Sequence, residues 1–130
     1  MKKEPLLGAG MSQPAAPYSM ALRVQANEML YIAGQGPTAG DGSIVGAGDI
    51  EAQVRQVFAN IQSLLEAAGA DFNNVVFMNM YVTDIRFRET ITMVRNEILE
   101  PPFPAATMVQ IGSLASTDWL VEIDAIAALD

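Results

Sequence analysis

Apolar residues recur at spacings of three and four between Ile50 and Ala68, which predicts one long amphipathic helix. Asp49 precedes the stripe as an N-cap, and Gly69 follows it where a left-handed residue commonly ends a helix. Residues 84–99 predict a second helix. It must stop at the prolines of the next segment, "EPPFP", because proline cannot continue the helical hydrogen bonds.

Five further segments predict strands. Residues 73–84 alternate with apolar side chains on both faces, so each face of this strand needs a cover. Residues 106–112 and 119–129 predict the last two strands. Near the start, strand-like runs at about 18–25 and 29–33 flank Asn27-Glu28, which predicts a hairpin. The glycine-rich residues 34–48 then form a long loop.

This order of elements predicts an α+β domain, one sheet with two helices on one face. The other face of the sheet would stay uncovered, and its apolar residues indicate self-association into a shared core. Residues 1–16 are rich in Gly, Pro, Ala and Ser, so we expect a flexible N-terminal arm before a single domain over residues 17–130.

The amino-acid composition limits which residues can act in catalysis and which partners are expected. The chain has neither histidine nor cysteine, so general acid–base work must use carboxylates, Tyr, Lys, the backbone or water. Seven basic residues oppose fifteen acidic ones, and a net charge of −8 repels nucleic acid. No apolar run is long enough to span a membrane. We expect a cytoplasmic protein with no nucleic-acid or membrane partner.

Glu122 and Asp124 stand out because they share one face of the last strand with Leu120 and Ile126. One interpretation is that this face is wet and both acids are solvated. The other is that the face lies at a subunit seam, where a partly desolvated carboxylate suits proton transfer. The spacing alone leaves both readings open.

Several motifs in order resemble one known family, the reactive intermediate deaminases (Rid, formerly YjgF). The matching segments are "APYSMALRV", "LYIAGQGP", "DIEAQVRQVFANIQSLLEAAGADFNNVV", "YVTDI", "FPAATMVQIGSLA" and "VEIDAIA". Together they cover about residues 17–129. The resemblance implies a chorismate-mutase-like fold and a homotrimer whose sheets form an inner barrel, with sites in clefts between subunits. It also implies hydrolysis of small enamines and imines to a keto compound and ammonia, without metal or organic cofactor.

The resemblance also assigns site residues. Glu122 matches the family acid that handles the attacking water, and Tyr18 matches the family's site tyrosine. Asp124 matches a second acid, for which we expect a structural role. The expected substrate-binding residues are Ala33, Gly34, Gln35, Ala106, Thr107 and Met108.

One departure from the family pattern concerns the substrate. Family deaminases carry an arginine in Pro-Ala-Arg-Ser/Thr, whose fork holds the substrate carboxylate. This chain has Pro104-Ala105-Ala106-Thr107, and Ala33 replaces the serine of the turn. We therefore expect a less cationic and more apolar pocket, with substrates that are bulkier or lack an α-carboxylate. Arginines at 23, 86, 88 and 95 are candidates to supply charge from elsewhere, although surface positions are commoner for each.

Three function classes follow. The first is a divergent Rid-type hydrolase, either on a general enamine or imine or on a changed substrate in an aromatic or specialised pathway, in the manner of 2-aminomuconate deaminase. The second is a non-catalytic trimer that binds a small molecule. The third is a chaperone or nuclease activity. The acidic net charge argues against the nuclease, because nucleic acid is itself negatively charged.

Overall fold

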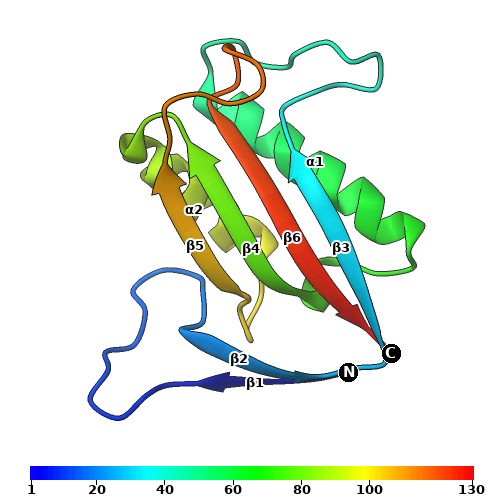
Figure 1. Ribbon diagram of the computed structural model, residues 1–130, viewed down its shortest axis with the longest axis vertical. Coiled ribbons are helices and arrows are strands. Elements are labelled where there is room, and N and C mark those ends of the chain that lie inside the picture. The colour runs from blue at the N-terminus through cyan, green and yellow to red at the C-terminus, as the bar shows by residue number, and fades with distance from the viewer.

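The computed structural model describes residues 1–130, and both helices pack on one face of a four-stranded sheet (Figure 1). The elements in chain order are β1 (Lys2–Leu6), β2 (Ala21–Gln25), β3 (Glu28–Gln35), α1 (Ile50–Ala67), η1 (Phe72–Asn74), β4 (Val75–Val82), η2 (Ile85–Phe87), α2 (Arg88–Ile98), β5 (Ala105–Gln110) and β6 (Val121–Leu129). This arrangement confirms the predicted α+β fold. Neither helix is long and apolar enough to cross a membrane.

The large sheet has the strand order β3-β6-β4-β5. β6 runs antiparallel to both β3 and β4, whereas β4 and β5 are parallel. A parallel pair needs a crossover, and α2 supplies it between β4 and β5. Because β5 is the last strand in this order, it is an edge strand, and α2 lies beside that edge. This edge is where the candidate site lies.

Helix α1 begins and ends as its sequence predicts. The Asp49 side chain accepts a hydrogen bond from the backbone N–H of Ala52, and Gly69 has a φ of 71° just beyond the helix. Val54, Val57, Phe58, Ile61 and Leu65 are buried against the sheet. Helix α2 ends at Ile98, before the prolines, as predicted.

The two faces of the sheet differ in their cover. Met78 and Met80 on β4 and Val121 and Ile123 on β6 are buried under the helices. The opposite face, here called the open face, has no helix over it. Its strand pairs include Phe77 with Ile126, Asn79 with Asp124 and Tyr81 with Glu122. The open face holds both carboxylates that the sequence singled out.

The hairpin predicted near the N-terminus is wrong. β2 and β3 form no hairpin, because β2 pairs antiparallel with β1 in a separate two-stranded sheet and β3 pairs with β6. Within residues 1–16, for which we expect a flexible arm, Lys2–Leu6 form β1. This polar strand is held by backbone pairing and by Lys3, whose Nζ donates to the carbonyls of Asn73 and Pro102. Such long-range contacts leave no local pattern in the sequence.

Candidate active site

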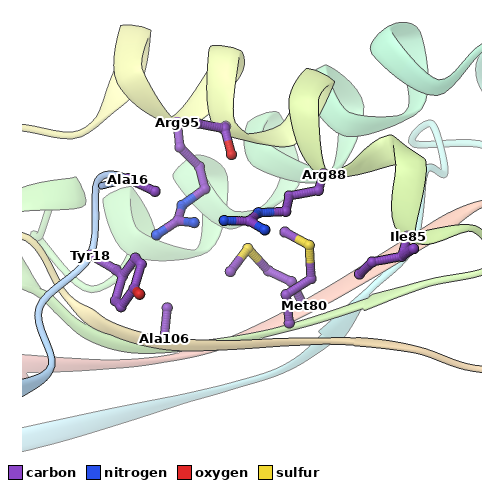
Figure 2. A pocket seen from close by; sticks show the side chains of 9 residues that line it. Ala16, Tyr18, Met80, Ile85, Arg88, Arg95 and Ala106 are labelled. Atoms are coloured by element: carbon purple, nitrogen blue, oxygen red, sulfur yellow. The ribbon is translucent and has the colours of Figure 1, made fainter. Parts of the chain in front are cut away.

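A cavity of about 230 Å³ lies between α2 and the β4–β5 edge of the sheet. Its lining residues are Ala16, Tyr18, Met80, Ile85, Arg88, Thr92, Arg95, Ala106 and Met108. Figure 2 shows Arg88 and Arg95 reaching from α2 toward the sheet, with Tyr18 and Ala106 on the facing side. The volume suits a ligand of a few heavy atoms rather than a large cofactor. Three of the predicted site residues, Tyr18, Ala106 and Met108, therefore lie together at this cavity.

Tyr18 is positioned by a segment fixed on both sides. The hydroxyl of Ser19 donates to the carbonyl of Phe103 at 2.6 Å, and the Ser19 N–H donates to the carbonyl of Pro104 at 3.0 Å. From the helix side, Nη2 of Arg95 donates to the carbonyl of Pro17 at 2.7 Å. These bonds tie the Tyr18 segment to the start of β5 and to α2, so the tyrosine ring is held at the cavity wall.

Arg95 is a buried cation. Its side chain is only 3% exposed, and its Nε is buried without a hydrogen-bond partner in the chain. Burial lowers the pKa of Arg95 to about 10, which still leaves the group charged at neutral pH. An unpartnered donor in a buried guanidinium costs free energy unless a ligand or water accepts from it.

The ion pairs of the chain distinguish the arginines at the cavity from the other arginines. The five arginines are at 23, 55, 86, 88 and 95. The first three each pair with carboxylates: Arg23 with Glu4, Arg55 with Glu51 and Glu97, and Arg86 with Asp84. Arg88 and Arg95 form no salt bridge, and both line the cavity. The two uncompensated guanidinium groups of an acidic chain are thus gathered at one site.

This finding corrects the expected character of the pocket. The alanine at 106 predicted a less cationic and more apolar cavity, and the strand side is indeed formed by Ala106 and Met108. The helix side, however, brings in two guanidinium groups. Surface positions were the commoner expectation for both, which holds for the exposed Arg88 but not for the buried Arg95. A usable signal existed, because Arg88, Thr92 and Arg95 are spaced four and seven apart and therefore share one helix face. The same reasoning missed Ala16, Met80 and Ile85 as lining residues.

Glu122 lies elsewhere, on the open face, and is seated against Gly34. A Cβ at Gly34 would clash with the carboxylate of Glu122, so a larger residue at position 34 would force this side chain to shift. Glu122 is half-buried and has no hydrogen bond or salt bridge within the chain. Its carboxylate is therefore free to accept from a ligand or water.

Asp124 differs from Glu122 because each of its carboxylate oxygens accepts a hydrogen bond within the chain. Nδ2 of Asn79 donates to Oδ1 at 3.0 Å, and the Tyr81 hydroxyl donates to Oδ2 at 3.2 Å. Desolvation, and then the Asp124 carboxylate, raise the pKa of the Tyr81 hydroxyl. These bonds favour the structural role that we expect for Asp124.

The other predicted substrate-binding residues do not line the cavity. Ala33 and Gly34 are exposed near a break in the β3–β6 register, and the Gln35 side chain donates to the carbonyl of Ala33 at 3.0 Å. Thr107 pairs with Asn79 and is exposed, on the sheet face opposite to Ala106 and Met108. Within one chain, Glu122 on the open face is therefore separate from the cavity on the helix side of the sheet. No group of three or more acidic side chains gathers as a possible metal site.

Comparison with known proteins places these features in a family. A sequence model described as endoribonuclease L-PSP matches residues 10–129. The chain belongs to this family. It is the Rid family that the sequence motifs predicted. A solved Rid-family structure from Yersinia pestis, a protein of unknown function, has a TM-score of 0.88 to this chain at 29% identity, and the match covers 99% of this chain and 100% of that one.

Two curated Rid relatives carry names that describe a reaction. The 3-aminoacrylate deaminase RutC of Acinetobacter baylyi is 33% identical over 98% of this chain and 98% of its own length. A 2-iminobutanoate/2-iminopropanoate deaminase of Bos taurus is 38% identical over 88% of this chain and 82% of its own length. Members similar to this chain over nearly its whole length are thus named as deaminases of small enamine or imine acids.

Proposed function

We propose that this Rid-family chain hydrolyses a small enamine or imine to the carbonyl compound and ammonia, with Glu122 as the group that handles the attacking water. One observation carries the assignment: Glu122 is the free carboxylate of the pair on β6, whereas the oxygens of Asp124 already accept from Asn79 and Tyr81. The names of the deaminase relatives support the reaction class.

The chemistry needs a base and an acid in turn. Glu122 takes a proton from water as the oxygen bonds to the imine carbon, and the C=N double bond becomes single. The same carboxyl group returns this proton to the nitrogen, which gives a carbinolamine. It then moves the hydroxyl proton to the amino group, so that the C–N bond breaks, ammonia leaves and the C=O bond forms. An enamine enters this route after protonation at its β-carbon. A positioned carboxylate of this kind typically contributes 10²–10⁴-fold in rate.

The proposal requires an assembly, because Glu122 and the cavity lie on opposite sides of the sheet in one chain. Exposed apolar side chains on the open face, Tyr31 at 74% and Val109 at 40%, favour packing against another copy. We propose the homotrimer implied by the family resemblance, in which the Glu122 face of one subunit meets the β5 edge of the next. The cleft between them would hold the substrate.

Ammonia release tests the function. The purified protein would be supplied with 2-aminoacrylate, formed in place by a separate lyase, and with a 2-aminomuconate-generating system. We expect faster ammonia release than without protein, and a fall in kcat of about 10²-fold or more for Glu122→Gln. Asp124→Asn is the matched control, with a much smaller fall in kcat. Equal rates for wild type and Glu122→Gln would refute the assignment, and tight binding without turnover would indicate a ligand-binding trimer instead.

The ribonuclease activity in the family's description is less well supported here. The chain carries a net charge of −8, and three of its five arginines are already paired with carboxylates. Phosphate backbones bind through accumulated positive charge, which this surface does not offer. The two unpaired arginines line a small cavity instead.

A further inference from the structure

The cavity in which Ala106 replaces the family arginine is cationic all the same, with its charge supplied by α2. Arg95 lies deep in the wall, and Arg88 is exposed on the same helix face (Figure 2). We propose that Arg95, assisted by Arg88, binds the carboxylate of the substrate, so that the protein acts on carboxylate-bearing enamines or imines. The enamine or imine group of this substrate rests on the proposed function, whereas the binding site for its carboxylate does not.

The hydrogen bonds of Arg95 leave one side of its fork available. Nη2 is occupied by the carbonyl of Pro17, which fixes the plane of the guanidinium group. Nε is buried and has no partner. A carboxylate is the acceptor that matches a guanidinium edge, and charge-assisted bonds of this kind are roughly twice as strong as neutral ones. Nε itself has almost no accessible surface, so a bound carboxylate would accept from it only when the guanidinium group turns toward the cavity.

The remaining walls limit the size and character of the ligand. Ala106 and Met80 face the arginines from the sheet, and Ile85 lies at one end (Figure 2). Met108 on β5 also lines the cavity. A volume of about 230 Å³ with these apolar walls suits a short keto or imino acid with a small apolar body. Inorganic phosphate shares the charge but not the apolar part, so it serves as a competing probe.

The alanine at 106 also has a reason in this arrangement. An arginine at 106 would extend from β5 into the cavity that already holds Arg88 and Arg95. Three guanidinium groups in so small a volume would repel one another, because neighbouring like charges are costly away from bulk water. The small side chain at 106 therefore leaves room for Arg95, and the positive charge of this cavity comes from α2.

Binding of a product-like acid and its neutral amide tests the inference directly. Calorimetric titration would compare pyruvate with pyruvamide on the intact protein. We expect wild type to prefer pyruvate by roughly tenfold to a hundredfold, and Arg95→Gln to lose most of this preference. Arg55→Gln removes a surface arginine that pairs with Glu51 and Glu97, and it should keep the preference. No preference in wild type, tighter binding of phosphate than of pyruvate, or an unchanged preference in Arg95→Gln would each overturn the inference.

Two further measurements guard against a variant that fails to fold. In wild type, the Nε–H resonance of Arg95 should shift on addition of pyruvate and not of pyruvamide, and the absence of a shift would contradict the proposal. In the double variant R95Q/A106R, an arginine returns from the strand side, so the preference for pyruvate should recover at least tenfold over R95Q alone. A106R in wild type should bring no such gain, and a comparable gain there would count against the proposal.

The outcomes also separate this inference from the proposed function. Selective pyruvate binding without ammonia release would uphold the anion site and refute the deaminase. Ammonia release at equal rates from an imino acid and from its amide would uphold the deaminase and refute the anion site.

Discussion

At the scale of single residues, the two acids on β6 have different surroundings. Asp124 accepts from Asn79 and Tyr81, whereas Glu122 lies over Gly34 with no bond in the chain. A carboxylate with filled hydrogen bonds holds its neighbours in place, and one with free oxygens can exchange protons with a ligand. The alternation of the strand puts both acids on one face but says nothing of their partners.

Replacing Gly34 tests how strictly Glu122 is seated. In Gly34→Ala the new Cβ would lie 2.4 Å from Oε2 of Glu122, so the carboxylate must move. We expect kcat to fall by roughly tenfold or more while the melting temperature changes little, because a misplaced catalytic group is costly in rate. Gly40→Ala is the control, since a Cβ there meets nothing within 4 Å. An unchanged kcat in Gly34→Ala would show that the position of Glu122 is unimportant.

Replacing Asp124 tests its structural role through Tyr81. In Asp124→Asn the negative charge disappears, so the raised pKa of the Tyr81 hydroxyl should move down toward its ordinary value. Because that pKa is raised in the folded protein, Tyr81 contributes stability below pH about 10, and this contribution is lost as pH rises through the folded-state pKa. Asp124→Asn should lower the free energy of unfolding at neutral pH by about 1–3 kcal/mol.

Ultraviolet titration of tyrosinate follows this change, with Tyr81→Phe identifying the step that belongs to Tyr81. A tyrosine titration identical in wild type and Asp124→Asn would contradict the coupling.

At the scale of elements, helix α1 organises the loop that leads into β6. The Gln53 side chain is fully buried, and its Nε2 donates to the carbonyls of Gly46 and Asp118 at 3.1 and 3.0 Å. Its Oε1 accepts from the N–H of Leu120 at 2.8 Å. One side chain thus joins the glycine-rich loop to the start of the strand that carries Glu122.

Gln53→Ala should therefore destabilise the protein by about 3 kcal/mol, because three backbone groups lose the hydrogen bonds that they make to this buried side chain. Gln62→Ala provides a control on the same helix, since its side chain is exposed and bonds only to Glu66. Chemical denaturation would measure both, and we expect less than about 0.5 kcal/mol for the control. Equal losses in the two variants would show that the hydrogen bonds of Gln53 add no stability.

At the scale of the whole molecule, the proposed site is divided. The cavity lies on the helix side at the β5 edge, and Glu122 lies on the open face. Neither half is complete within one chain. If both halves act together, each site must draw on two copies, which makes assembly a condition of activity rather than an addition to it.

Mixed assemblies test this division. Glu122→Gln and Arg95→Gln should each be nearly inactive alone. In co-expressed trimers, a neighbouring pair can supply an intact Glu122 from one copy and an intact Arg95 from the other, so roughly a quarter of the sites should recover. Ammonia release would measure the recovery. Activity no higher than that of the single variants would place both groups within one copy, or show that the site is not shared.

The open face offers a second test of assembly. Tyr31 is 74% exposed in the single chain, and Tyr31→Glu would place a charge in the proposed interface. We expect sedimentation to show a trimer for wild type and smaller species for this variant. Met93→Glu alters an exposed apolar residue on α2 and should leave the trimer intact. A monomeric wild type would refute the shared site.

The sequence predicted those parts of the fold whose cause is local. The caps of α1 and the apolar alternation of β4 depend on neighbouring residues, and both were confirmed. The pairing of β2 with β1 depends on contacts between distant residues, so the predicted hairpin was wrong. The candidate site followed the same rule. Family motifs predict Tyr18 and Glu122 as site residues, whereas the setting of Arg95 includes a hydrogen bond to Pro17, far away in the chain.

The two guanidinium groups beside Ala106 have a consequence for how sequences like this one are compared. If position 106 alone is compared, the protein counts as a family member without an arginine for recognising acids. In three dimensions the cavity next to Ala106 still receives Arg88 and Arg95, which come from another element. If Arg95 binds the substrate carboxylate as we propose, such sequences are better sorted by the charge that enters the cavity than by the residue at one position.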